Sequence, residues 1–293
     1  QGSGLSAGDA SHHPVSTWVK TFGNSMKKKT DGAKKGYSAT TGGIELGFDT
    51  EVSPGVVLGA GFGFAKSKIK TKTTPSDKSD IKNYQGALYV SYSPEADYFV
   101  DGILSYGKNY YKTNRTIELG GLTRQAEGKF TGTQPSAQIR VGYNWSEGEV
   151  VVTPFTALRY THLNQKSYSE TGADALSLKD VESEKMKSIE GSLGVNVAYT
   201  MWEQDDTRFI PELHAIYAHD FKAAENTTSA RFNDESSKLF ETKGEKAPKS
   251  SYNLGAGFTV LSGDAWNISA QYNYEAKKKF ESHSAVLNVK YLW

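Results

Sequence analysis

Apolar and polar residues alternate along most of this chain. In the stretch NLGAGFTV (253–260), every second residue from Leu254 onward is apolar, and the residues between them are polar or glycine. The stretch WNISAQYNY (266–274) repeats the pattern from Trp266. Successive side chains of a β-strand point to opposite faces of a sheet. Each stretch is therefore predicted to be a strand with one apolar face and one polar or small face.

The same period predicts twelve strands. Their approximate ranges are 16–23, 37–49, 55–69, 81–93, 97–111, 127–145, 149–163, 184–201, 207–221, 249–261, 265–278 and 283–293. Because the number is even, both ends of an antiparallel sheet lie at the same rim. A soluble sandwich can also expose a polar face to water, so the alternation alone does not decide between a sandwich and a barrel.

The connections distinguish these two folds. Every second connection is short, as in TEVSP (50–54), SPEA (93–96) and SGD (262–264). The others are read as long polar loops, including KTNRTIELGGLTRQ (112–125) and KKKFES (277–282). Outer-membrane barrels combine short periplasmic turns with longer extracellular loops. The predicted fold is therefore all-β: a 12-stranded antiparallel transmembrane β-barrel over residues 16–293.

Composition is compatible with this fold. Hydrophobic residues make up 37% of the chain and the mean hydropathy is −0.56. No run of apolar residues is long enough for a transmembrane helix, but a barrel strand needs only alternate apolar residues. The opening QGSG looks like a cleavage scar or linker, so the chain is interpreted as a piece of a longer protein. Residues 1–15 are predicted to be a linker or the remnant of a helix in the lumen.

In several predicted strands the second face carries charge, and this face is assigned to the barrel lumen. The predicted lumen-facing polar residues are Glu45, Asp101, Arg140, Arg159, Glu190, Glu212, Glu275 and Lys290. Gly59, Gly61 and Gly63 share the lumen face and are predicted to clear interior space.

Tryptophans gather near the ends of the predicted strands at the short-turn rim. They are Trp18, Trp145, Trp202, Trp266 and Trp293. Indole rings favour the membrane–water interface, where the ring is in apolar surroundings and the N–H is hydrated. These residues are predicted to form a periplasmic aromatic girdle. Strand parity would point Trp202 inward unless the strand bends at Met201, and five ordinary core tryptophans are the alternative interpretation.

Catalytic and ligand-binding signatures are weak. Of the six histidines, His214 shares the lumen face with Glu212 and is interpreted as a hydrogen-bonded lumen group; His283 and Ser284 are neighbours on a strand and so point to opposite faces. The glycines of GVVLGAGFG (55–63) lie along a strand and do not lead into a helix, as a dinucleotide site requires. The chain has no cysteine, and its net charge is +1. No enzymatic activity, cofactor, metal site or nucleic-acid partner is predicted.

Lysine runs occur in the predicted outer loops, for example at 27–29 and 277–279. A solvated loop is the simpler interpretation of these runs, and attraction to anionic lipid headgroups or a host polyanion is the alternative.

The motifs in their order resemble the translocator barrel of monomeric autotransporters, the type V secretion family, and in detail its rickettsial surface cell antigen group. The resemblance covers Trp18–Trp293 and rests on STWVKTFGNS (16–25), GYSATTGGIELGFDTEVS (36–53), VTPFTALRYTHLNQKSYSETG (152–172) and the aromatic final strand. It implies a cell-surface export function: the barrel sits in the bacterial outer membrane, surrounded by its lipids, and supports secretion of an N-terminal passenger. The implied partners are this passenger, a helix in the lumen and the barrel-assembly machinery, and the barrel itself is expected to be a monomer.

The family resemblance also gives a meaning to the final strand. Its lipid-facing residues are Ala285, Leu287, Val289, Tyr291 and Trp293. Alternate apolar residues before an aromatic one resemble the signal that the barrel-assembly machinery recognises. Some family members cleave themselves at an asparagine pair in the lumen helix, but residues 1–15 contain no such pair. Two other functions remain open: an outer-membrane pore or adhesin without a passenger, and an outer-membrane hydrolase.

Overall fold

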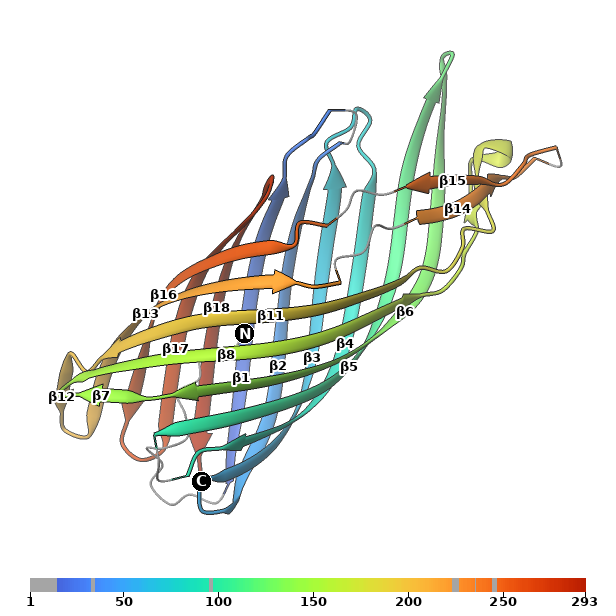
Figure 1. Ribbon diagram of the computed structural model, residues 1–293. Coiled ribbons are helices and arrows are strands. Elements are labelled where there is room, and N and C mark those ends of the chain that lie inside the picture. Colours follow the sequence, from blue (N-terminus) through green and yellow to red (C-terminus); the bar gives the residue numbers. More distant parts are fainter. Residues whose placement is uncertain (1–14, 33–34, 95–96, 223–226, 235, 244–246) are drawn as a thin grey trace.

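A computed structural model describes residues 15–32, 35–94, 97–222, 227–234, 236–243 and 247–293. Twelve strands form one closed antiparallel barrel (Figure 1). They are β1 (Val15–Lys28), β2 (Tyr37–Ser53), β3 (Val56–Thr71), β4 (Lys78–Tyr92), β5 (Tyr98–Leu119), β6 (Leu122–Tyr143), β8 (Val150–Gln165), β11 (Lys185–Tyr199), β13 (Thr207–Asp220), β16 (Ser250–Ser262), β17 (Trp266–Lys277) and β18 (Phe280–Leu292). The predicted number of strands and the predicted fold class are confirmed. The predicted linker or helix remnant lies, except for Val15, outside the described residues.

The first and last strands close the barrel. β1 pairs with β18 over thirteen residues, from Ser16 opposite Leu292 to Lys28 opposite Phe280. Beyond this ladder, the Trp293 N–H donates to the Val15 carbonyl at 2.9 Å. Closure leaves no unpaired strand edge exposed to lipid, where an unsatisfied backbone group is costly.

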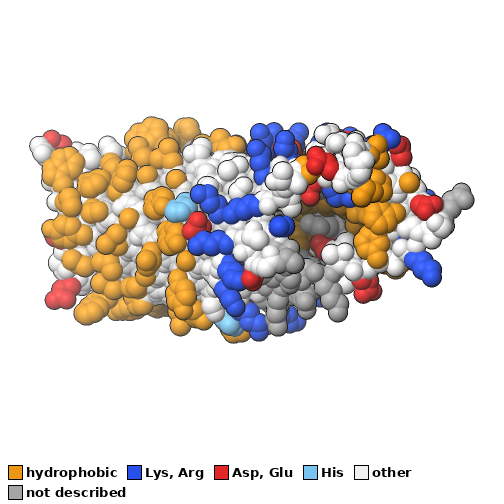
Figure 2. Space-filling model, turned by 90° about the horizontal axis from the view of Figure 1, so that it is seen from above, with side chains coloured by type: hydrophobic (Ala, Val, Ile, Leu, Met, Phe, Trp, Pro, Cys, Tyr) orange, Lys and Arg blue, Asp and Glu red, His pale blue; other side chains and the backbone are white. Residues whose placement is uncertain are grey.

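The outer surface of the barrel is apolar. Large apolar side chains are exposed on every barrel strand, for example Leu88 at 64% and Leu213 at 64%. Figure 2 shows this surface as a broad band of hydrophobic side chains, bordered on one side by lysines and arginines. Such a band suits a lipid environment, whereas a soluble protein would cover it.

Short turns occupy one rim, as predicted, but the opposite rim is less uniform. β5 and β6 continue through the predicted loop 112–125 as a hairpin whose turn is Gly120-Gly121, both with positive φ (55° and 81°). Glycine tolerates this backbone, which suits a two-residue hairpin turn. Likewise, the predicted loop 277–282 is a tight turn between β17 and β18. These two loop predictions were wrong, because charged residues were taken as loop signals.

Part of the long-loop rim is itself structured. The short strands β10 (Leu178–Lys179), β14 (Thr227–Phe232) and β15 (Phe240–Lys243) form a small sheet beside the projecting β5–β6 hairpin (Figure 1). The two-residue strand β9 (Glu170–Thr171) pairs with β6. Arg115 of β5 forms a 2.6 Å salt bridge with the buried Glu170 carboxylate, which also accepts the Leu178 N–H. The connection between β8 and β11, which contains Glu170 and Leu178, is therefore held against the barrel wall by an ion pair and by backbone pairing.

Candidate functional site

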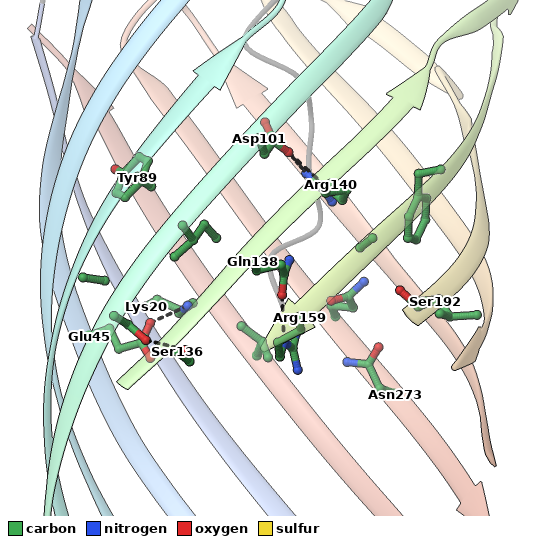
Figure 3. Close-up of a pocket in the computed structure, with 18 of the residues that line it drawn as sticks. Lys20, Glu45, Tyr89, Asp101, Ser136, Gln138, Arg140, Arg159, Ser192 and Asn273 are labelled. Carbon is green, nitrogen blue, oxygen red and sulfur yellow. Dashed lines mark hydrogen bonds and ion pairs between the residues drawn. The ribbon is translucent and has the colours of Figure 1, made fainter. Parts of the chain in front are cut away.

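The barrel lumen contains a cavity of about 820 Å³. Strands from the whole circumference contribute alternate side chains to it, which are mainly polar, small or charged. Figure 3 shows Lys20, Glu45, Asp101, Arg140 and Arg159 projecting from the wall into this space. The strand period therefore produces two environments from the same segments: apolar outside and predominantly polar inside.

Charges on the lumen wall occur largely as pairs between neighbouring strands. Arg140 of β6 donates from Nε to the Asp101 carboxylate of β5 at 2.9 Å. Lys20 of β1 pairs with Glu45 of β2 (Figure 3). Arg159 of β8 donates to the Gln138 amide oxygen at 2.8 Å, and its guanidinium lies 3.8 Å from the Glu190 carboxylate. These contacts compensate charge locally, so the lumen wall is polar without a strong field of either sign.

Seven of the eight predicted lumen residues line the cavity. They are Glu45, Asp101, Arg140, Arg159, Glu190, Glu275 and Lys290. The eighth, Glu212, has its side chain packed within the wall and is 5% exposed. Its carboxylate accepts hydrogen bonds from Thr259 at 2.8 Å and Asn196 at 3.4 Å. Glu212 thus joins three adjacent strands instead of projecting into the open space.

Trp18 lies inside the barrel, and its assignment to the external girdle was wrong. Its ring lines the lumen, covers Gly47 and Gly61, and donates through Nε1 to the Tyr89 hydroxyl at 2.7 Å. A Cβ at Gly47 would lie 2.4 Å from the Trp18 ring. Trp18 shares its parity with Lys20, and that signal in the sequence predicts an inward side chain.

The other four tryptophans are exposed on the outer surface. Trp145, Trp202, Trp266 and Trp293 are 60%, 48%, 46% and 63% exposed. β11 ends at Tyr199, and Trp202 begins the separate short strand β12 (Trp202–Gln204), so the parity of β11 does not extend to it. Their exposure at the short-turn rim is compatible with the predicted girdle. Trp266 and Trp293 both contact the Tyr291 ring, at 4.8 and 5.1 Å between centroids.

A buried carboxylate connects the two ends of the sheet, and the sequence did not indicate it. Asp49 of β2 accepts hydrogen bonds from the Ser16 hydroxyl of β1, the Tyr89 hydroxyl of β4 (2.8 Å) and the Lys290 ammonium of β18 (2.9 and 3.2 Å). Asp49 and Lys290 are 241 positions apart in the chain. The register of four strands brings these groups together, and a single strand pattern cannot reveal it. We call Ser16, Asp49, Tyr89 and Lys290 the seam cluster.

The final strand has the predicted alternation. Val286, Asn288 and Lys290 line the lumen, whereas Leu287 is 45% exposed on the outside. Tyr291, with its contacts to the exposed Trp266 and Trp293, lies on the same outer face. Recognition of this face by an assembly factor remains a prediction.

The lumen histidine singled out in the sequence is fully engaged in hydrogen bonds. Both ring nitrogens of His214 have hydrogen-bond partners, Asn253 at 3.1 Å and the Gln271 amide at 3.1 Å. Within the described ranges, no three His, Cys, Asp or Glu residues are grouped so that they could hold a metal ion. The described part of the chain also has no helix that is both long and apolar enough to cross a membrane.

Comparison with known families identifies the chain. Residues 17–273 match the family described as "Autotransporter beta-domain". The chain belongs to this family. Similar proteins include Outer membrane protein B of Rickettsia prowazekii, 25% identical over 293 residues, and Outer membrane protein A of Rickettsia conorii, 30% identical over 252 residues. These alignments cover 98% and 83% of this chain but 18% and 12% of the relatives, so the autotransporter barrel corresponds to a small part of each relative.

Solved autotransporter domains have the same fold. The translocator domain of NalP from Neisseria meningitidis superimposes with a TM-score of 0.77 at 17% identity, covering 97% of this chain and 90% of that domain. The β domain of Bordetella BrkA gives a TM-score of 0.67 at 16% identity, covering 96% of this chain and 100% of that domain. The family, the names of the relatives and the closed barrel place this autotransporter domain in the bacterial outer membrane.

Proposed function

We propose that this barrel anchors in the outer membrane and supports export of a passenger, N-terminal to it, through its lumen to the cell surface. The observation that carries the proposal is the lumen: a polar cavity of about 820 Å³, enclosed by a closed barrel of the autotransporter family. The chain spans only 18% of the relatives named Outer membrane protein B, so the passenger and its role belong to the proposal.

The lumen wall suits the transit of a polypeptide. An extended chain carries unpaired backbone N–H and C=O groups. Placing each unpaired group in hydrocarbon costs on the order of several kcal/mol, because its hydrogen bonds with water are lost. Side chains such as Gln138, Ser192 and Asn273 offer exchangeable hydrogen bonds along the lumen (Figure 3). The strong charges are already paired, as in Arg140 with Asp101. A passing segment would therefore find hydrogen-bond partners along the wall without forming strong ion pairs with it.

We also propose roles for the ends of the sheet. The outward residues of β18 from Ala285 to Tyr291, together with the terminal Trp293, serve as the assembly signal for the barrel-assembly machinery. Trp145, Trp202, Trp266 and Trp293 serve as the periplasmic girdle. The seam cluster supports closure of a monomeric barrel, because β1 and β18 share the Asp49 carboxylate. The proposed role of the domain is transport rather than catalysis, and the two engaged nitrogens of His214 support this.

A secretion assay tests the proposal. A folded reporter is placed between a signal peptide and this barrel, and the fusion is expressed in a Gram-negative host. We expect protease added to intact cells to digest the reporter, while the barrel shows the shifted gel mobility of a folded outer-membrane barrel. Assembly of the barrel with the reporter retained in the periplasm would refute the export function and favour the pore or adhesin alternative.

A further inference from the structure

An aromatic row marks the outer edge of the apolar band on β3–β5. Phe64, Tyr84 and Tyr110 lie side by side on the outer surface, with ring centroids 5.1 and 5.9 Å apart. On β4, Tyr84 is eight residues from Tyr92, which lies near the short-turn rim. At about 3.4 Å per residue and a tilt of roughly 40°, these rings are about 20 Å apart along the barrel axis. Such a spacing suits the two interfaces of an outer-membrane barrel.

Lysines lie at the level of this row and beyond it. The outward-facing set, here called the outer lysine patch, consists of Lys66, Lys68, Lys70, Lys78, Lys82, Lys108, Lys112 and Lys129. Asp80 and Glu127 are the acidic residues interspersed among them. The Lys108 ammonium lies 5.4 Å from the centre of the Tyr110 ring, which places this charge at the level of the aromatic row.

The strand register sets like charges directly against each other in this patch. Lys66 is the cross-strand partner of Lys82, and Lys70 is the partner of Lys78. Like charges at opposed positions destabilise a sheet. Within the described residues, neither Lys66 nor Lys82 has a carboxylate as an ion-pair partner, and both side chains are exposed.

The third opposed pair shows how such a repulsion is relieved. Lys112 faces Lys129 across β5 and β6, and the Glu127 carboxylate bridges them, at 2.6 Å from Lys112 and 2.7 Å from Lys129. Hydrogen bonds from Lys112 and then Lys129 lower the pKa of Glu127 to about 2. A carboxylate thus bridges this opposed pair. Near Lys66 and Lys82 the corresponding carboxylate is Asp80, two residues before Lys82 on the same face; its cross-strand partner is Lys68, and within the described residues it forms no ion pair with Lys66 or Lys82.

We propose that the outer lysine patch binds the phosphate groups of lipid headgroups in the outer leaflet, with Lys66 and Lys82 as the principal contacts. Three features support this assignment: the excess of positive charge, its position at the edge of the apolar band, and an opposed lysine pair that forms no ion pair with any described residue. Basic residues at a membrane surface each add to the attraction of anionic lipids. The binding does not depend on the presence of a passenger, so it can be tested on the barrel alone.

The barrel offers a matched control. Lys185 and Lys187 of β11 also face outward near the long-loop rim, but Lys187 is opposite His162 and Lys185 is opposite Asn164 on β8. The variant K185Q/K187Q therefore removes the same charge as K66Q/K82Q without touching an opposed lysine pair.

Lipid binding is measured by native mass spectrometry on the barrel released from phosphatidylcholine nanodiscs, with bis-phosphorylated lipid A as the probe. We expect K66Q/K82Q to weaken lipid A binding about tenfold or more, and K185Q/K187Q by less than threefold. Dephosphorylated lipid A should bind both variants and the wild type equally. Equal affinity of K66Q/K82Q and wild type, or an equal loss in the two variants, would overturn the proposal. So would displacement of lipid A by inorganic phosphate at the same concentration, because this would indicate a site for free phosphate.

A thermal measurement gives an independent readout. In phosphatidylcholine, Lys66→Gln should raise the unfolding temperature or leave it unchanged, because a like-charge contact is removed. With lipid A in the bilayer, the same substitution should lower it relative to wild type. The same direction of change in both bilayers would contradict the proposed lipid contact.

Discussion

Charge is arranged differently on the two faces of this barrel wall. Inside, cations lie beside carboxylates, as Arg140 lies beside Asp101 and Lys290 beside Asp49. Outside, beyond the aromatic row, the register opposes lysine to lysine. Strand pairing therefore places opposite charges together where a polypeptide is proposed to pass. On the outer face only part of the positive charge is compensated, by Glu127 between Lys112 and Lys129, and the opposed Lys66 and Lys82 lie where an external anion is proposed to bind.

The largest predicted effect concerns the inner face at the seam. Asp49→Ala removes the carboxylate that Lys290, Ser16 and Tyr89 share, and Lys290 stays in the wall without its counter-ion. We expect a loss of about 3 kcal/mol in the free energy of unfolding, measured by urea titration in lipid vesicles. Asp49→Asn keeps a hydrogen-bond acceptor and should lose about half as much. If Asp49→Ala unfolds like wild type, the seam cluster does not stabilise closure.

The next effect concerns the glycines that make room for Trp18. A Cβ at Gly47 would lie 2.4 Å from both the Ala60 carbonyl oxygen and the Trp18 ring, whereas at Gly42 the nearest atom is 3.9 Å away. Gly47→Ala should therefore lower the free energy of unfolding by about 1–3 kcal/mol. Gly42→Ala, on the same strand, should be neutral or slightly stabilising. Similar losses for the two variants would show that the lumen packing around Trp18 is not tight.

Fluorescence can separate the inward tryptophan from the outward ones. Variants that keep only Trp18 or only Trp266 are reconstituted with lipids brominated near the headgroup, which quench nearby indoles. Trp266 should be strongly quenched, and Trp18 less than half as much, because its ring lies across the wall from the lipid. Equal quenching would return Trp18 to the external girdle.

The smallest effect concerns the bridged lysine pair of the outer face. The pKa of Glu127 is lowered from 4.5 to about 2. The contribution of its ionised carboxylate to folding stability is therefore complete above pH 4.5 and is lost as the pH falls toward 2. The carboxyl carbon shift of Glu127 should titrate near pH 2. Lys112→Gln should raise this midpoint more than Lys129→Gln does, because Lys112 contributes the larger stabilising contact. A wild-type midpoint near 4.5 would contradict the bridging geometry.

The fold was predictable from sequence because strand period and turn chemistry are local. Alternation located all twelve strands, and the side-chain parity from Glu45 to Lys290 placed seven of eight polar residues in the lumen. Position along a strand was a poorer guide than parity: Trp18 lies at the predicted rim but faces the inside. Charge was also misleading as a loop signal, since 277–282 forms a tight hairpin.

The seam cluster and the outer lysine patch could not be predicted in the same way. Both depend on which residues stand opposite each other on neighbouring strands, and a shift of one residue would turn each side chain to the other face. Asp49 meets Lys290 only because β1 lies between β2 and β18 in a fixed register. Lys66 and Lys82 are likewise separated by the whole β3–β4 connection.

The most direct test of the central claim follows a passenger during export. A photo-crosslinking amino acid replaces Gln138, which lines the lumen, or Leu104, which is 63% exposed on the outside of the neighbouring strand. The passenger is stalled by a folded disulfide loop and the cells are irradiated. We predict crosslinks to the passenger from position 138 and none from position 104. Crosslinking from position 104 alone, or from neither position while the passenger reaches the surface, would contradict passage through this lumen.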